Sequence, residues 1–302
     1  MSFIGVPDLP LPGHGRTLER LRGLTALGRA DLAGARLGEG HADAVAIRAE
    51  LGSSDASENP AGERWGVWAA APDSVRAVHG PSGWRLTGDR PWCSGADWCT
   101  HALVTAAAAD GIRLFAVTNT APTAGPLDGT WPAVGMAGSD SRTVRFTDAP
   151  GHPVGGPGAY VDRPGFWHGG IGVAAVWYGG ALGVADKLRA AFAKERSPHA
   201  YAHLGAVDVA LGAAGSVLSA AADAIDASPS DNQHRLALRV RATVEATATS
   251  VLDRVGRALG AGPLCQDHAR RVADLTVYLR QSHAEDDLEQ LGRLLIREDL
   301  SW

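Results

Sequence analysis

The segment GWRLTGDRPWCSGADWCTHALVTA, residues 83–106, is the most informative part of the sequence. Its centre is the five-residue turn Trp-Cys-Ser-Gly-Ala at 92–96. Short runs rich in apolar and β-branched residues that are separated by Gly-containing turns predict β-strands. Taken alone, this pattern would place Trp92 in the core between two strands and would make Ser94 part of a plain turn. The two runs that flank the turn are 84–87 and 102–106.

The same pattern continues on both sides of this segment and defines a β-domain over residues 61–155. Short runs with strand character are separated by turns of Gly, Pro and Asp, such as the Gly-Pro-Ser-Gly turn at 80–83. We therefore expect an antiparallel β-domain. Besides the two runs named above, its predicted strands are 65–70, 75–78, 114–118 and 143–146.

Helical periodicity replaces the strand pattern before and after this domain. Leucines recur at every third position within residues 17–37, and a second helical run covers 41–51. Residues 1–60 are therefore expected to form a small N-terminal helical region. The helical period returns in residues 160–302, where a four-helix bundle is the economical packing. Helices of that bundle are predicted at 165–194, 200–225, 232–260, 268–280 and 284–297.

Local signals indicate where linkers lie and where helices begin and end. Residues 52–62 and 150–164 are rich in Ser and Asn or in Gly and Pro, and both are predicted linkers. Capping-box spacing, in which a Ser is followed three residues later by Gln or Glu, occurs at 230–233 and 282–285 and predicts two helix starts. Gly260 is expected to end the helix that precedes it.

The composition is that of a globular protein. Of the 302 residues, 45% are hydrophobic and 20% are charged, and the formal net charge is −5 at pH 7. An acidic chain without a Lys/Arg cluster is not expected to bind nucleic acid. The N-terminal residues lack a signal-peptide pattern and no apolar run approaches about 20 residues, so we expect a cytoplasmic protein that does not bind a membrane. The three cysteines form no metal-type pair, and no metal site is predicted.

The order of helices, β-domain and helical bundle resembles the flavin-dependent acyl-CoA dehydrogenase superfamily. The fold that this implies is α+β, with short N-terminal helices, a central antiparallel β-barrel domain and a C-terminal four-helix bundle. Residues 92–96 are similar to the family's W-[IC]-[ST]-[NG]-[AG] turn, which in the family lies against the flavin ring. The resemblance therefore implies FAD as cofactor and Trp92, Cys93 and Ser94 as contacts. An indole can cover the flavin ring, and hydroxyl and N–H groups can bond its polar edge.

Further segments extend the resemblance. Residues 135–148, GMAGSDSRTVRFTD, are similar to the family's GMRGSxTxxxxFxxVxVP, which closes the β-domain. A partial match to the family's RxxFGxPxxxxQ implies that Arg189 and His203 contact the adenine half of FAD in a neighbouring subunit. Gly260 and Gly262 stand where the family places a Gly-rich segment against the FAD diphosphate, and glycine lets the backbone approach a phosphate closely. His203 as a core or capping residue, and Gly260 as a simple helix end, stay open as alternatives.

The sequence departs from the family at the catalytic base. The family reaction needs a carboxylate to take the α-proton, but the two positions where that Glu usually stands hold Val173 and Ser282. The nearest candidates for a catalytic residue are His283 and Glu285, with His168 as a third. A His titrates near neutral pH, and some flavin monooxygenases of this fold use a His in the corresponding region. Structural roles stay open, because Glu285 would complete a capping box and His283 could be solvent-exposed.

Three functions stay open at this point. The first is an FAD-dependent oxidoreductase that desaturates the α,β-bond of an acyl thioester carried by CoA or a carrier protein. The second is a flavin-dependent monooxygenase of the same fold, which a His in place of the Glu favours. The third is a base-less partner subunit in a hetero-oligomer with a longer relative, which the short N-terminal region favours. The family builds each FAD site from two chains, so an oligomer is expected in every case: a homodimer or homotetramer, or a hetero-oligomer with a longer relative.

Overall fold

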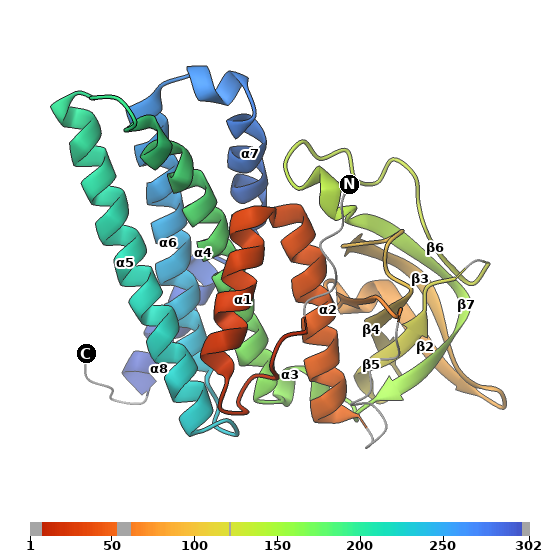
Figure 1. The fold of residues 1–302 in the computed structure, drawn as a ribbon. Helices are drawn as coiled ribbons and strands as arrows, with labels where there is room; N and C mark the ends of the chain where they lie inside the picture. The colour runs from red at the N-terminus through yellow and green to blue at the C-terminus, as the bar shows by residue number, and fades with distance from the viewer. Residues whose placement is uncertain (1–7, 53–61, 121, 298–302) are drawn as a thin grey trace. The chain divides into compact units, whose positions relative to one another are not determined.

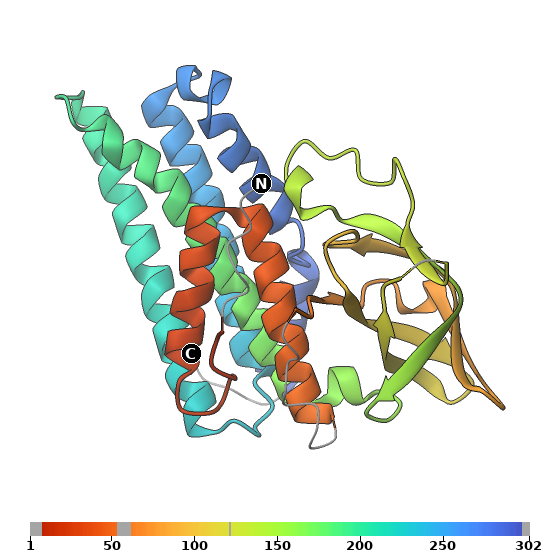
Figure 2. The same ribbon diagram turned by 45° about the vertical axis from the view of Figure 1, so that its right-hand side comes forward.

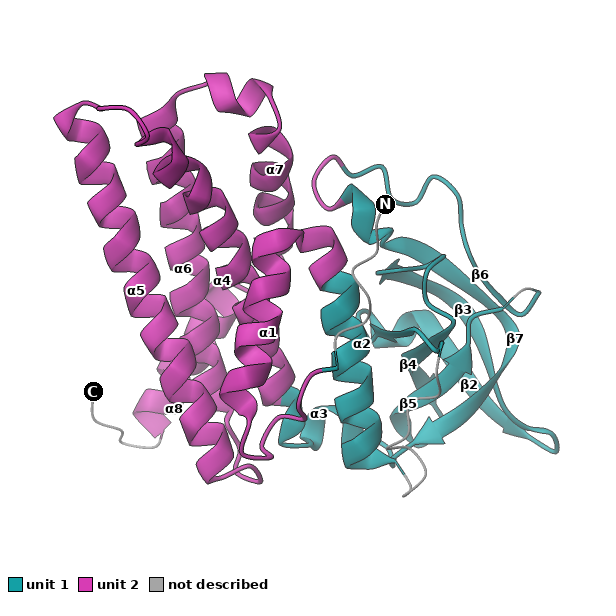
Figure 3. Ribbon diagram, viewed as in Figure 1, with its two compact units in different colours: residues 1–8, 36–133, 137–166 teal, residues 9–35, 134–136, 167–302 magenta. Residues whose placement is uncertain are grey.

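The structure is a computed structural model that describes residues 8–52, 62–120 and 122–297. Its described residues form two compact units, which Figure 3 distinguishes by colour. Each unit is made of segments that are separate in the sequence. Unit 1 is built mainly from Arg36–Ala133 and Ala137–Phe166, and unit 2 from Leu9–Ala35, Val134–Met136 and Trp167–Trp302.

The N-terminal region contains two helices, α1 at Thr17–Ala30 and α2 at Leu32–Leu51. A single residue, Asp31, separates them, because its extended backbone ends α1. The sequence predicted this break between the two helices later, between residues 37 and 41. The boundary between the two units falls within α2, so the N-terminal helices are divided between the units. The predicted sequence domains 1–60, 61–155 and 160–302 stay a prediction.

Seven strands form the sheet of unit 1, in the order β1-β4-β2-β3-β7-β5, with β6 paired to β7 and β4 paired also to β5. Because β4 pairs with both β2 and β5, five strands close into a barrel, as the turned view in Figure 2 shows. The predicted barrel is confirmed. The strands are β1 Trp65–Trp68, β2 Val75–Gly80, β3 Gly83–Cys93, β4 His101–Ala108, β5 Gly111–Thr118, β6 Ala124–Pro126 and β7 Arg142–Val154.

Two pairings correct the expectation of a wholly antiparallel domain. β1 pairs in parallel with β4 along Trp65–Trp68, and β2 pairs in parallel with β4 where Arg76 lies opposite Ala107. The reason is that β1 and β2 run in the same direction along one side of β4, separated by the short 3-10 helix η2 at Pro72–Ser74. The pairs β2–β3, β3–β7, β4–β5, β5–β7 and β6–β7 are antiparallel.

Strand β7 is longer than the sequence indicated. It continues past the predicted end at Phe146 to Val154, so the predicted linker 150–164 begins as strand and also contains the short helix α3 at Ala159–Asp162. Its two prolines suggested a linker, because proline cannot donate to a strand ladder. The strand accommodates them by bending at Asp148, which has a φ of +51°, next to a shift in its register against β3.

The core of the barrel comes from side chains that alternate along the strands. In β2, Val75 and Ala77 are buried whereas Arg76 and Val78 are exposed, the period of two that a strand with one covered face requires. The inward positions of the other strands complete one apolar cluster. Its largest members are Trp68, Leu86, Phe115 and Phe146, and both Cys93 and Cys99 belong to it.

Three long helices frame unit 2, α4 at Gly165–Ala191, α5 at Pro198–Ala227 and α6 at His234–Leu259 (Figure 1). Two shorter helices, α7 at His268–Leu279 and α8 at Glu285–Arg297, pack against α6. α4 is the central helix, and its Ile171, Val176, Trp177 and Val184 are fully buried. All five bundle helices occur where the sequence predicted them, with ends displaced by a few residues.

Helix α1 lies so close to α4 that side chains are excluded at the crossing. A Cβ added at Gly179 would lie 2.1 Å from the Thr25 carbonyl oxygen, and one added at Gly28 would lie 2.3 Å from the Val176 carbonyl oxygen. Real Cβ atoms do not approach backbone oxygens this closely. The two glycines therefore allow the backbones of α1 and α4 to meet.

The predicted helix starts at the two capping boxes are wrong in detail. α6 begins at His234, and its N–H donates to Asn232 Oδ1 at 3.0 Å, without a side-chain cap from Gln233. α8 begins at Glu285 because Ala284 takes a left-handed φ of +47°, so Ser282 Oγ accepts from the Ala284 N–H at 3.1 Å. The predicted end at Gly260 is confirmed by its φ of +69° and its N–H bond to the Gly256 carbonyl.

Helix α5 is apolar and weakly covered. By length and composition it could cross a membrane, with a mean hydropathy of 1.6 in its most apolar window, of which 22% is buried. The sequence analysis missed this because scattered polar residues, such as Asp208 and Asp223, interrupt the apolar runs. One such helix is weak evidence for a membrane span, because core helices of globular proteins meet the same criteria.

Candidate functional site

Trp92 occupies an unusual place at the end of β3. The pairing of β3 with β7 shifts register between Arg90 and Cys93, and Trp92 lies in this irregular stretch with a φ of +57°. The left-handed conformation costs an L-residue about 1–2 kcal/mol. The bulge turns the indole outward, where it is 62% exposed, and turns Cys93 into the barrel core. Trp92 is therefore not a core residue, and the alternative that the sequence left open is excluded.

The turn that carries Trp92 is fixed to a second loop of the barrel. The Gly95 N–H donates to the Ser139 carbonyl at 2.8 Å and the Ala96 N–H to the Asp140 carbonyl at 3.1 Å. Ser141 Oγ lies within hydrogen-bond distance of Ser94 Oγ, at 2.9 Å, and of Ser139 Oγ, at 2.8 Å. The two sequence segments that carry the family resemblance, 92–96 and 135–148, thus meet in unit 1. Their hydrogen bonds hold the Trp92 turn rigid.

An arginine supports the same loop from its outer side. The Arg142 guanidinium forms ion pairs with Asp140, at 2.6 Å, and with Asp97. The hydrogen bonds that Arg142 donates to these carboxylates raise its pKa. The Asp97 N–H also donates to Asp140 Oδ2 at 2.9 Å, which closes the network around the turn. The sequence did not predict this network, although Asp140 and Arg142 lie within the recognised segment 135–148.

Of the three predicted flavin contacts in unit 1, only the Trp92 side chain points outward. Ser94 is 7% exposed and its hydroxyl faces Ser141. Burial raises the pKa of the Cys93 thiol, whose S–H lies 3.3 Å from the Arg90 carbonyl. A ligand at this turn would meet the Trp92 indole, while Cys93 and Ser94 could contribute backbone groups.

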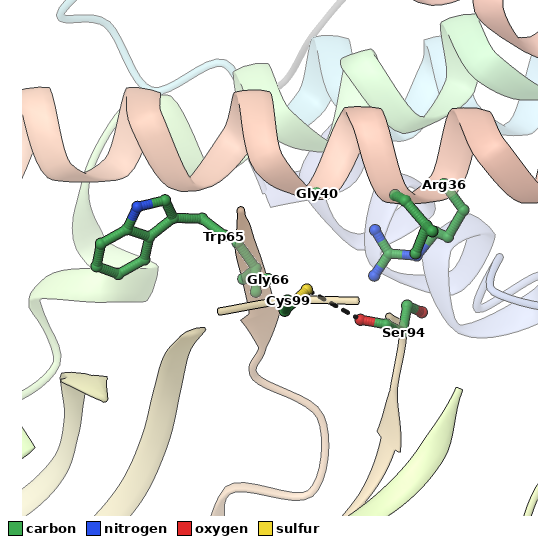
Figure 4. A pocket seen from close by; sticks show the side chains of 8 residues that line it. Arg36, Gly40, Trp65, Gly66, Ser94 and Cys99 are labelled. Atoms are coloured by element: carbon green, nitrogen blue, oxygen red, sulfur yellow. Dashed lines mark hydrogen bonds between the residues drawn. The ribbon is translucent and has the colours of Figure 1, made fainter. Parts of the chain in front are cut away.

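A small cavity lies behind the turn, between α2 and the barrel (Figure 4). Arg36 and Gly40 of α2 face Trp65, Ser94 and Cys99 across it. Its volume is about 10 Å³, which is room for about one water molecule. A flavin ring does not fit there.

The four bundle residues predicted to contact FAD, two at its adenine side and two at its diphosphate, lie at one end of unit 2. Arg189 is in the last turn of α4, His203 near the start of α5, and Gly260 and Gly262 directly after α6. The antiparallel course of these helices brings the four positions to the end drawn uppermost in Figure 1. Arg189 is exposed, and a Cβ added at either glycine would meet nothing within 4 Å. The backbone there is open to a ligand.

The two predicted catalytic residues follow α7 and are separated from that end by its 12 residues, or about 18 Å of helix. His283 is 70% exposed, and its Nδ1 lies 3.2 Å from Asp287 Oδ1. Glu285 is exposed in the first turn of α8. The third candidate, His168, is buried near the start of α4.

The carboxylates and the arginine around His283 were not predicted from the sequence. Asp287 is 6% exposed and pairs with Arg241 of α6, whose Nε lies 3.5 Å from Asp287 Oδ2. Ser282, one of the two positions where the family carries its base, donates to Glu245 Oε2 at 2.9 Å. The sequence offered one local signal for Asp287, which is its spacing of four residues from His283 at a predicted helix start. Arg241 and Glu245 come from another helix and left no local signal.

No protein-family model and no curated protein matches the sequence, whereas solved structures match most of it. FMN-bound TdsC from Paenibacillus sp. A11-2 is 16% identical, with a TM-score of 0.81 over 93% of this chain and 84% of that chain. A nitrososynthase from Micromonospora carbonacea var. africana is 20% identical, with a TM-score of 0.75 over 92% and 81%. The Tcur3481-Tcur3483 steroid ACAD is 17% identical, with a TM-score of 0.70 over 93% and 88%.

These identities are too low to transfer an activity, and folds of this kind host more than one reaction. The agreement covers 92–93% of this chain and concerns the fold alone. It confirms the fold that the segments 92–96 and 135–148 implied. The chain has the fold of the flavin-dependent acyl-CoA dehydrogenases.

Proposed function

We propose that the protein is a flavin-dependent oxidoreductase. The proposal rests on Trp92. Its backbone is left-handed, its indole is exposed, and hydrogen bonds fix its turn to a neighbouring loop. Strain in the backbone persists where the surrounding structure enforces it, and it concentrates at functional sites. An exposed indole would bury its apolar face under a flat aromatic ring such as a flavin. The similar structure of TdsC holds FMN, which supports the same class of cofactor.

The residues fit a flavin, although the choice between FAD and FMN depends on unit 2. FAD stays our proposal because four positions at one end of the bundle could receive its adenine and diphosphate half: Arg189, His203, Gly260 and Gly262. The open backbone at the two glycines supports it. FMN, the flavin of TdsC, is the alternative. Chromatography of the flavin released from the denatured protein distinguishes the two.

For the reaction we propose monooxygenation, in which His283 transfers a proton. This proposal is supported by the residues at the two usual base positions, Val173 and Ser282, which cannot take a substrate proton, and by the exposed His283 that follows Ser282 in the chain. In this reaction a reduced flavin, O₂ and the substrate give the oxidised flavin, water and a substrate that has gained one oxygen atom. Both hydrogens of the reduced flavin end in the water, and His283 would carry one of them as a proton.

Desaturation of an acyl thioester, on CoA or a carrier protein, stays the second candidate because of one observation. Glu245 reaches the usual base position from α6, with Oε2 2.9 Å from the Ser282 hydroxyl. In this reaction the base takes the α-proton and the flavin takes the hydride from the β-carbon. Glu245 is already engaged, since Arg280 also donates to its Oε1 at 3.0 Å. We therefore rank it below His283.

Two experiments on the purified protein separate these functions. Anaerobic mixing with a panel of acyl-CoA thioesters bleaches the flavin of a desaturase but leaves that of a monooxygenase oxidised. Turnover of pre-reduced protein with ¹⁸O₂ and a panel of small aromatic, amine and sulfur-containing substrates places ¹⁸O in a product only for a monooxygenase. Absence of both signals in a flavin-loaded protein would contradict both reactions and favour a partner subunit of a longer relative.

We also propose that a second copy of the chain covers helix α5. The most apolar window of α5 is 22% buried, and Tyr201 and Val209 are large exposed side chains on it. An extended apolar surface of this kind marks a binding face. Val209→Glu should convert a dimer or tetramer to a smaller species in light scattering, whereas Val78→Glu, at an exposed position of β2, should not. Binding of the wild type to lipid vesicles without self-association would contradict the proposal.

A further inference from the structure

The exposed imidazole of His283 rests on a buried carboxylate. Its Nδ1 lies 3.2 Å from Asp287 Oδ1, and the exposed fractions of the two side chains are 70% and 6%. The residues are four apart, so they share one face at the start of α8. A carboxylate accepts hydrogen bonds and cannot donate them, so a hydrogen bond between a neutral His283 and Asp287 requires the proton on Nδ1.

Asp287 is in turn held by an arginine in the core of unit 2. Arg241 Nε lies 3.5 Å from Asp287 Oδ2, and the guanidinium lies over the buried Trp177 ring, 4.8 Å from its centre. Burial lowers the pKa of Arg241, and the charge of Asp287 acts against that shift. Arg241 also donates to the Gly170 and Gln281 carbonyls, at 3.2 Å each. These bonds fix the guanidinium of Arg241, which meets Asp287 at ion-pair distance.

The turn between α7 and α8 is anchored a second time by the next turn of α6. Glu245, four residues after Arg241, accepts from Arg280 at 3.0 Å and from Ser282 at 2.9 Å. Ala284 lies within this turn and has a left-handed φ of +47°, which an alanine rarely adopts. The strain indicates that the bonds from α6 impose the shape of the turn. An ordinary exposed histidine needs no such support.

We propose that Asp287 is a positioning residue for His283: it fixes the imidazole in the tautomer protonated on Nδ1 and so presents Nε2 as the proton acceptor, and Arg241 holds Asp287 in place. This inference rests on the proposed function only in assigning a proton-transfer role to His283. The arrangement itself is independent of the cofactor. A carboxylate behind a histidine orients the ring and stabilises its protonated form during proton transfer.

The tautomer of His283 tests the proposal without any turnover. Two-bond ¹H–¹⁵N correlation spectra of the full chain, labelled at its histidines, distinguish the two neutral forms at alkaline pH, where imidazoles are uncharged. His283→Gln assigns the signal. The expected result is the form protonated on Nδ1 in the wild type, and a shift towards the form protonated on Nε2 in Asp287→Asn. Asp286→Asn, a change of the neighbouring exposed carboxylate, should leave the spectrum unchanged.

A wild-type His283 in the form protonated on Nε2 would overturn the proposal, even if Asp287→Asn failed to fold. Once a substrate is known, His283→Gln should lower kcat by about 100-fold. Asp287→Asn should lower it by a smaller factor, with an unchanged KM. A correct tautomer without an effect of His283→Gln on kcat would keep the arrangement and contradict only the proposed role of His283 in the reaction.

Discussion

The Trp92 turn of unit 1 and the His283 turn of unit 2 present an exposed ring in two different ways. Both contain a non-glycine residue in left-handed backbone, Trp92 itself and Ala284. The Trp92 turn is held mainly by backbone N–H bonds to a neighbouring loop and by three buried serine hydroxyls, and the Arg142 ion pairs beside it involve the more exposed carboxylates of Asp97 and Asp140. The His283 turn is held by ion pairs and side-chain bonds that reach down from α6.

The two turns should therefore respond differently to salt and to the loss of one interaction partner. Neutral backbone bonds are insensitive to salt and are lost one at a time, at about 1 kcal/mol each. A buried ion pair fails in a single step, because removing one partner leaves the other charge without compensation. The His283 turn should therefore be the more fragile of the two.

The largest effect is expected from Arg241→Met. The variant leaves the carboxylate of Asp287 buried without its guanidinium and should lower the free energy of unfolding by about 3–5 kcal/mol. Urea denaturation measures it. The control is Arg257→Met, which breaks a solvent-exposed pair with Asp253 and should leave the free energy of unfolding nearly unchanged. Equal losses in the two variants would contradict the fragility of the His283 turn.

A smaller effect is expected from Ser141→Ala in the Trp92 turn. It removes the shared partner of the Ser94 and Ser139 hydroxyls, which stay buried, and should cost about 1–3 kcal/mol. Thermal unfolding in a calorimeter gives the value. Thr276→Ala, whose hydroxyl donates to the Val272 carbonyl on the exposed side of α7, should stay within about 0.5 kcal/mol of the wild type. A loss larger than that of Arg241→Met would reverse the predicted order of the two turns.

Replacing Trp92 and Ala284 by glycine distinguishes the effect of backbone strain on stability from the effect of the Trp92 indole on flavin binding. Trp92→Gly and Ala284→Gly should each raise stability by up to about 1 kcal/mol, because glycine adopts a left-handed φ without a steric cost. Only Trp92→Gly should weaken flavin retention. The flavin-to-protein ratio after desalting measures that retention. If Trp92→Gly and Ala284→Gly retained equal amounts of flavin, Trp92 would not be a flavin contact.

The smallest effect is a dependence of stability on pH in each unit. Burial, together with the charge of Arg48, lowers the pKa of His41 in unit 1, whose Nδ1 accepts the Trp65 N–H at 3.1 Å. Burial lowers the pKa of His268 in unit 2. A histidine whose pKa is lowered by folding binds more protons when unfolded, so stability is full above a pH of about 6.5 and declines as the pH falls below it.

Urea denaturation from about pH 8 to pH 5 follows this decline. His41→Gln and His268→Gln should each make it shallower, and the double variant should make it shallower than either. A wild-type stability that rises as the pH falls through this range would contradict the sign of both pKa shifts.

The sequence predicted the architecture because its signals were periodic and local. The helices of unit 2 follow runs of helical period, and Gly260 ends α6 as its position indicates. The parallel pairing of β1 and β2 with β4 was not predictable, because it depends on the course of the chain through η2. The two prolines in β7 concealed the second half of that strand.

In the candidate site, too, local features could be predicted from the sequence and long-range contacts could not. The Trp92 turn was found through a contiguous segment, but its outward indole depends on the bulge in β3, which no local pattern specifies. His283 was found by counting from family positions, whereas its supports come from distant parts of the chain. Arg241 and Glu245 lie on another helix, about 40 residues earlier in the sequence, and packing alone brings them to the α7–α8 turn.

The most direct test of the flavin proposal is a binding titration of the flavin-free protein with FAD and with FMN, followed by flavin fluorescence and repeated with Trp92→Gly. The structure predicts saturable binding of one of the two by the wild type, with quenching by the adjacent indole, and a clear loss of affinity in the variant. Failure of the folded wild type to bind either flavin would contradict the proposal for the isolated chain.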